Sequence, residues 1–357
     1  MRYGLIVVIV SFVQLSFAQS NFEGLGVGIR PELGTIIPHR VLMKHLVQGH
    51  TRGVNLELLY QTTGKKEWQS VYNYPKIGGI LYFTDFGYSE VLGQAIGGYS
   101  VIMLPFFRKN NFSFNSRLGV GLAYHTKTFD QEVNPKNNVI SSAMNSLIVL
   151  GVELEHRMEK GALTMSSNLT HFSNGASKMP NLGINTAVFS LGYTYFFNEF
   201  IPKDELIKKE YVKQPVSAYL MGIGSLREVY PTGGRKYPIG SFSFIAQKQL
   251  RPKLGAEIIA DVFYNASNRV MVEHANASHW ETVQLGLYAG AFLPINKVDL
   301  LVGMGCYLKN DFNLYGLFYH RFGMRYHISN RWMANLTIKA HWGRADYFEY
   351  GIAYKLF

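Results

Sequence analysis

The stretch from Ala162 to Phe197 reads ALTMSSNLTHFSNGASKMPNLGINTAVFSLGYTYFF. Its outer parts alternate apolar and polar residues with a period of two, and its centre is rich in Gly, Pro and Asn. This pattern predicts a β-hairpin. The apolar face of the first strand ends in His171 and Ser173, and Asn185 falls on the same face of the returning strand.

His171 and Ser173 are two residues apart, so on a strand they share a face with Cβ atoms roughly 7 Å apart. That separation is within reach of a hydrogen bond between a base and a nucleophile. A His-x-Ser pair alone is weak evidence, because such pairs are common on strands. Polar residues at the end of an apolar stripe, however, are unusual for a core and suit a hydrolase whose substrate is a lipid.

The whole chain has the composition of a transmembrane β-barrel. It is 14% aromatic and only 17% charged, it contains 35 glycines, and it alternates over many short segments. No apolar run reaches the roughly 20 residues that a spanning helix needs. The last strand alternates up to the terminal Phe357, which resembles the assembly signal of bacterial outer-membrane barrels. A secreted, soluble β-sandwich is the alternative fold.

Sixteen strands are predicted, eight in each half of the chain. They lie near residues 23–31, 51–62, 73–85, 94–107, 114–126, 144–157, 162–173 and 185–197, and then 216–226, 237–249, 254–265, 280–293, 298–308, 313–328, 331–342 and 346–357. The connections alternate between short turns and longer loops, as in bacterial barrels. A periplasmic N-terminus then places the 174–184 loop outside the cell.

The two halves resemble a duplication, since SLGYTYFF (190–197) parallels YGIAYKLF (350–357). A charged segment at 198–214 separates them, and many predicted interior positions of the second half are Gly, which suits a small, filled lumen. We therefore expect two tandem eight-stranded barrels rather than one sixteen-stranded barrel. The expected divisions are a signal peptide at 1–18, a first barrel at 19–197, a linker at 198–214 and a degenerate second barrel at 215–357.

The signal peptide is predicted from Arg2, the apolar run that follows it and the sequence Ser16-Phe17-Ala18. These are the three parts of a cleavable export signal. A retained N-terminal anchor is the alternative.

Two motifs of the hairpin, HFSN at 171–174 and PNLGI at 180–184, resemble the active-site segment of the PagL-type lipid A 3-O-deacylases, which are outer-membrane β-barrel esterases. The resemblance implies that His171 is the general base and Ser173 the nucleophile, with Asn174 in the oxyanion region. The family has a Glu where this chain has Asn185. An Asn can hold an imidazole tautomer, but it cannot stabilise an imidazolium by charge.

Further residues of the loop have expected roles under the same resemblance. Backbone N–H groups near Asn174 and Gly175 are expected to stabilise the oxyanion. Asn181 and Gly183 are expected to shape the loop, either as turn formers or through a direct role. The expected partners are lipid A, or lipopolysaccharide, and the outer membrane of a Gram-negative bacterium.

Other features limit the possible functions. The formal net charge of +11 suits contact with an anionic surface such as phosphorylated lipid A. The single cysteine, Cys306, predicts neither a disulfide framework nor a metal cluster, and no cofactor or nucleic acid is expected. The competing functions are a catalytically inactive structural or surface-interaction barrel and a porin, which would need a wide polar lumen.

The second half lacks the machinery of the hairpin. His341 has no Ser two residues further on, and its position in the alternation puts it on the polar face with Lys339 and Glu349. We expect His341 to belong to a polar network in the lumen, because buried polar groups pair with one another.

Overall fold

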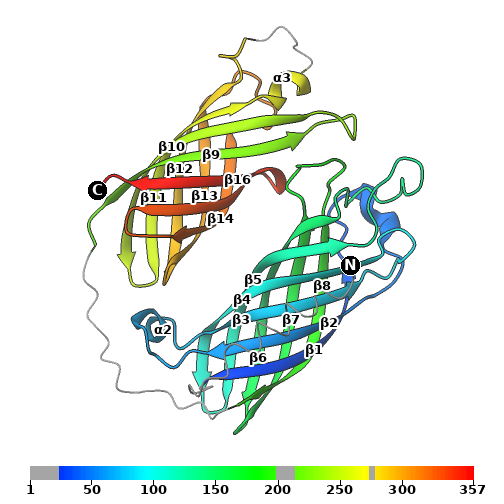
Figure 1. Cartoon of the computed structure of the whole chain (residues 1–357), viewed down its shortest axis with the longest axis vertical. Helices are drawn as coiled ribbons and strands as arrows, with labels where there is room; N and C mark the ends of the chain where they lie inside the picture. The colour runs from blue at the N-terminus through cyan, green and yellow to red at the C-terminus, as the bar shows by residue number, and fades with distance from the viewer. Residues whose placement is uncertain (1–23, 198–213, 273–277) are drawn as a thin grey trace, which may run out of the picture.

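The computed structural model describes residues 24–197, 214–272 and 278–357 (Figure 1). The predicted signal peptide and nearly all of the predicted linker lie outside these residues. The fold is all-β, with two closed antiparallel barrels of eight strands each. The predicted fold class and the preference for two small barrels over one large barrel are confirmed.

The first barrel contains eight strands that pair in chain order, and β1 pairs with β8 to close it. The strands are β1 (Leu25–Ile36), β2 (Thr51–Gln61), β3 (Lys76–Asp85), β4 (Gln94–Lys109), β5 (Phe112–His125), β6 (Met144–Arg157), β7 (Gly161–Ser173) and β8 (Ile184–Phe196). Two short helices lie in its connections, η1 (Val41–Leu46) and α2 (Glu67–Val71).

The second barrel repeats the plan, with β9 pairing both β10 and β16. Its elements are β9 (Ser217–Glu228), β10 (Lys236–Arg251), β11 (Leu254–Asn265), α3 (Ser267–Met271), β12 (Val283–Ile295), β13 (Val298–Lys309), β14 (Phe318–His327), β15 (Trp332–His341) and β16 (Arg344–Lys355). None of the helices in the described residues is long and apolar enough to cross a membrane.

Most strand ends fall close to the predicted positions, and β1 and β14 are the main exceptions. The strand predicted from residue 313 begins only at Phe318. β1 differs at its C-terminal end. It was predicted to end near residue 31, but it continues to Ile36. The extension stays paired on both sides, with Leu33 opposite Arg52 on β2 and Phe189 on β8. The connection from β2 to β3 is also longer than a turn, because it carries α2.

Each barrel is apolar outside and charged inside. On β7 the outward residues Leu163, Met165 and Leu169 are 41–52% exposed, whereas the lumen residues Ser166 and Asn168 are buried. This is the reverse of a soluble protein and is typical of barrels with lipid around them.

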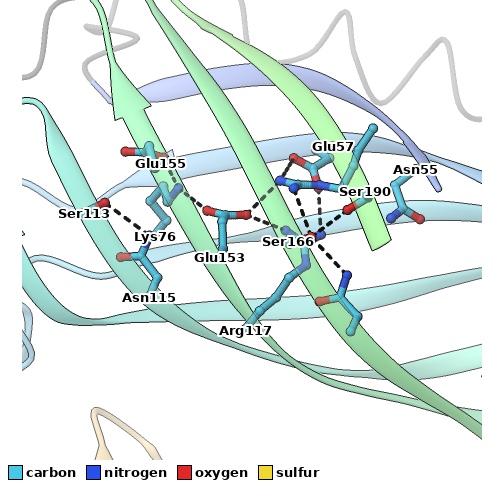
Figure 2. Close-up of polar contacts among 12 residues, drawn as sticks. Asn55, Glu57, Lys76, Ser113, Asn115, Arg117, Glu153, Glu155, Ser166 and Ser190 are labelled. Carbon is cyan, nitrogen blue, oxygen red and sulfur yellow. Dashed lines mark hydrogen bonds and ion pairs between the residues drawn. The ribbon is translucent and has the colours of Figure 1, made fainter. Parts of the chain in front are cut away.

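Ion pairs fill the lumen of the first barrel (Figure 2). Arg117 contacts Glu57 at 2.7 Å and Glu153 at 3.1 Å, and Arg30 contacts the same two carboxylates at 3.0 and 2.8 Å. Lys76 adds a contact of 2.8 Å to Glu153. These side chains come from different strands, so the network joins the barrel wall across its interior.

The second barrel has a network of the same kind made from other residues. Arg321 lies 2.6 Å from Glu349 and 3.2 Å from Asp261, and Arg325 pairs with Glu257. Lumen glycines make room for large rings, as the sequence predicted. A Cβ at Gly286 would lie 2.7 Å from the Tyr319 hydroxyl. His341 is buried in this lumen with its Nε2 atom 3.0 Å from the Tyr307 hydroxyl, which confirms its predicted placement.

Candidate active site

His171 and Asn185 lie opposite each other on β7 and β8, on the outer face of the first barrel. His171 Nδ1 donates to Asn185 Oδ1 over 2.6 Å. The strand register creates this contact, because directly opposed side chains on one face of an antiparallel pair are close neighbours. His171 is half-buried and stands at the end of the exposed apolar stripe that includes Leu169.

A second histidine extends this pair. The Asn185 amide donates from Nδ2 to His39 Nδ1 over 3.0 Å. His39 follows β1, and the closure of the barrel between β1 and β8 brings it here, with the Ile37 N–H donating to the Asn185 carbonyl at 2.8 Å. Burial, and then the charge of Arg40, lower the pKa of His39 and keep its ring neutral as an acceptor. His39 was not predicted as a site residue, because only the closure of the barrel brings it to the hairpin.

Ser173 ends β7 and is 3% exposed. Its Oγ atom accepts two hydrogen bonds, from the Gly175 N–H at 3.1 Å and from Asn181 Nδ2 at 2.9 Å. The loop 174–183 therefore folds back over the hydroxyl. Gly175 has a φ of +62°, a conformation that favours glycine and lets the chain turn back within two residues.

Asn174 supports the loop rather than pointing at Ser173 Oγ. Its Nδ2 atom donates to the hydroxyls of Ser141 and Ser142 at 3.1 and 3.0 Å and to the Lys178 carbonyl at 3.0 Å. Its backbone N–H donates to Asn181 Oδ1 at 3.2 Å. Asn181 thus bridges the backbone of Asn174 and the hydroxyl of Ser173.

Gly183 lies beside the His171 ring. It has a φ of +74°, and a Cβ built on it would lie 3.0 Å from His171 Cε1 and 2.9 Å from the Phe172 carbonyl oxygen. A side chain at this position would crowd the imidazole, so the glycine leaves room for the histidine on the Nε2 side.

The structure brings His171, Ser173 and Asn185 to the same end and the same outer face of the barrel. Within the described residues, no hydrogen bond joins His171 to Ser173. Because Nδ1 of His171 is bonded to Asn185, Nε2 is the ring atom left to accept a proton. Hydrogen bonds of this kind are often long in unliganded enzymes and shorten when substrate binds.

The arrangement can support acyl transfer. It offers a hydroxyl, an imidazole whose tautomer is fixed by a second residue, and two N–H donors that converge near the hydroxyl. These are the parts of a serine hydrolase, except that an amide occupies the place of the acid.

Comparisons with known proteins point to one family. The family model for lipid A 3-O-deacylase (PagL) matches residues 52–194. The model for the C-terminal domain of acyloxyacyl hydrolase matches residues 216–357. No curated protein matches the chain.

Among solved structures, a porin of Rhodopseudomonas blastica (a triple mutant) is 8% identical over 93% of this chain and 99% of that chain, with a TM-score of 0.20. The COG4313 outer membrane channel from Pseudomonas putida F1 is 9% identical over 95% and 97%, with a TM-score of 0.19. Likenesses this low support no conclusion about function. The two family models together cover most of the first barrel, from β2 to most of β8, and the second barrel, and the chain belongs to the PagL family of lipid A 3-O-deacylases, which are carboxylic ester hydrolases.

Proposed function

We propose that this protein is an outer-membrane serine esterase that hydrolyses an ester-linked acyl chain of lipid A. The observation that carries the proposal is the set of His171, Asn185 and Ser173 on the apolar outer wall, with two N–H donors aimed at the Ser173 hydroxyl. Family membership supports the reaction class.

In the proposed reaction, Ser173 Oγ attacks the ester carbonyl carbon while His171 Nε2 takes the hydroxyl proton. The Gly175 N–H and Asn181 Nδ2 donate to Ser173 Oγ before the reaction, and they transfer to the adjacent carbonyl oxygen as it becomes the oxyanion. One good donor of this kind contributes about 3–4 kcal/mol. The tetrahedral intermediate then collapses, and His171 protonates the departing sugar alkoxide. Water, activated by His171, hydrolyses the acyl ester on Ser173 and releases the fatty acid.

Asn185 limits this mechanism in a defined way. Its Oδ1 atom holds the His171 ring with a proton on Nδ1, which leaves Nε2 as the base. It carries no charge to stabilise the imidazolium that forms during the attack. The enzyme should therefore be slower than a homologue with a carboxylate at this position.

The position of the site suits a membrane substrate. The site lies at the barrel end that carries the loops 37–50, 86–93, 126–143 and 174–183. In bacterial barrels the longer loops lie outside the cell. We infer that the site faces the outer leaflet, where lipid A can approach along the apolar wall without leaving the membrane.

A second candidate function is a catalytically inactive wall or surface-interaction protein. Asn185 in place of the acid and the missing hydrogen bond between His171 and Ser173 in the described residues favour it. A fluorophosphonate probe separates the two functions, because the probe labels only an activated serine.

The test replaces Ser173 by Ala in the full-length protein and measures lipid A from producing cells by mass spectrometry. The wild type should release a hydroxy-fatty acid, and Ser173→Ala should release none. Ser167→Ala, which changes an exposed serine on the same face of the same strand, is the control and should keep full activity. Heat-modifiable electrophoretic mobility verifies folding, and equal release by Ser173→Ala and wild type would end the proposal.

A further inference from the structure

The two barrels contact each other at both ends, side by side and with the same orientation (Figure 1). At the end opposite the site, the Tyr72 hydroxyl, beside α2, donates to the Pro294 carbonyl over 3.1 Å, and the Lys253 ammonium lies 5.5 Å from the Tyr72 ring. At the site end, the Glu228 N–H donates to the Ala176 carbonyl over 3.2 Å. These separate contacts fix one barrel against the other.

The contact at the site end falls on the active-site loop itself. A Cβ built on Gly175 would overlap the ring of Phe348, which lies on the outer face of β16. The ring of a residue from the second barrel therefore occupies the space beside the glycine whose N–H donates to Ser173 Oγ.

Exposure along β15 and β16 shows the same covered patch. On the outer face, Tyr350 and Ile352 are 57% and 48% exposed, as expected for a wall facing lipid. Ile338, which is opposite Phe348 in the strand register, is only 7% exposed. The outer wall is thus covered where the loop of the first barrel meets it.

The loop needs this support because its backbone is strained. Ala176 has a φ of +63°, which a residue with a Cβ rarely adopts. Such conformations persist when the surroundings fix them. Here the hydrogen bond from Glu228 and the ring of Phe348 hold the two residues, Gly175 and Ala176, that follow the nucleophile in its backward turn.

We propose that the second barrel is a positioning partner for the active site, with Phe348 and the Glu228 N–H holding the Gly175–Ala176 turn so that the Gly175 N–H stays beside the Ser173 hydroxyl, where the oxyanion forms. The inference rests on the proposed function and assigns a role to the half that lacks a site of its own. Phe348 is a positioning residue and need not touch the substrate.

The experiment measures the rate at which a small fluorophosphonate labels Ser173 in the full-length protein. This probe needs the oxyanion donors but has no long acyl chain, so it separates positioning from acyl-chain binding. Removing one oxyanion donor costs roughly 10²–10³-fold in rate, and a displaced donor should cost less, about 10-fold for Phe348→Ala. With lipid A as substrate, kcat should fall while KM stays near the wild-type value.

Phe242→Ala is the matched control, because Phe242 is 55% exposed on the outer face of β10 in the same barrel. It should leave the labelling rate unchanged. Phe348→Leu, which keeps much of the side-chain volume, should recover most of the rate. If Phe348→Ala does not fold, the comparison of Phe348→Val with Phe242→Val carries the test, because Val leaves most of the ring's space beside Gly175 empty. A slower rate for Phe348→Val supports positioning.

Three results overturn the inference. Equal labelling rates for Phe348→Ala and Phe242→Ala would show that Phe348 does not position the turn. Faster labelling of Phe348→Ala means that the ring shields Ser173 instead. A rise in KM with unchanged kcat means that Phe348 binds the acyl chain. The proposed function fails separately, when Ser173→Ala keeps its activity.

Discussion

The two barrels share one architecture and differ in the connection between their last two strands. Each has eight strands, an apolar outer wall and a lumen filled with ion pairs. Loop 174–183 joins β7 to β8 and folds back over the Ser173 hydroxyl, whereas only Trp342 and Gly343 join β15 to β16. The barrel is thus a scaffold common to both halves, and the proposed chemistry depends on one hairpin and its loop.

Two histidines make the difference concrete. His171 faces outward beside Asn185, and His341, also near the end of the penultimate strand of its barrel, faces the lumen. Side chains alternate along a strand, so a shift of one residue reverses the face on which a histidine lies. Asp346 lies 3.9 Å from the His341 ring, inside the ion network.

The largest expected effect comes from removing each histidine in turn. His171→Ala should lower kcat for lipid A by about 10²–10⁴-fold, because general-base catalysis contributes that much. His341→Ala should leave activity near the wild-type level. Release of fatty acid by purified, folded protein is the measurement, and equal losses in both variants would mean that the outward-facing site is not the catalytic one.

The lumen networks should matter for stability in both barrels. Arg117→Met leaves the buried Glu57 and Glu153 without one of their cations, and breaking a buried pair in this way costs about 3–5 kcal/mol. Urea titration followed by heat-modifiable mobility measures the loss. Arg52→Met, at an exposed position on β2, should cost less than about 1 kcal/mol. Matching midpoints for the two variants would show that the network contributes nothing.

Asn185 gives the smallest expected effect and the only expected gain. Asn185→Glu supplies a negative charge that Asn185 lacks, and it should raise kcat by roughly 10-fold by stabilising the imidazolium. Asn185→Ala should lower kcat, because nothing then fixes the His171 tautomer. Steady-state measurements of kcat at pH 7 and above, on the Asn185→Glu and Asn185→Ala variants, test these expectations. A slower Asn185→Glu variant would mean that the cost of burying the carboxylate exceeds its benefit.

The sequence predicted the barrels well because the period of two along each strand records which face meets lipid. It placed Leu169, His171 and Asn185 on the outer face and Lys339 and His341 in the lumen for this reason. The sequence could place His171 and Asn185 on one face because both lie on the two strands of a single hairpin.

Contacts made by tertiary structure could not be predicted in this way. His39 reaches Asn185 only because the first and last strands of the barrel pair, and Phe348 reaches Gly175 only because two barrels dock. The hydrogen bond from Asn181 to Ser173 depends on the path of an irregular loop, which no periodicity encodes. The alternation of apolar and polar residues predicts the barrel wall. The candidate site also depends on contacts between elements that are distant in the sequence, which this alternation does not predict.

The ion pairs of Arg30 and Arg117 with Glu153 help to fill the lumen of the first barrel with paired side chains. In an outer membrane, a barrel filled in this way would add no open pore to the permeability barrier. Under the proposed function, lipid A would reach the outer wall of the barrel by lateral diffusion within its own leaflet.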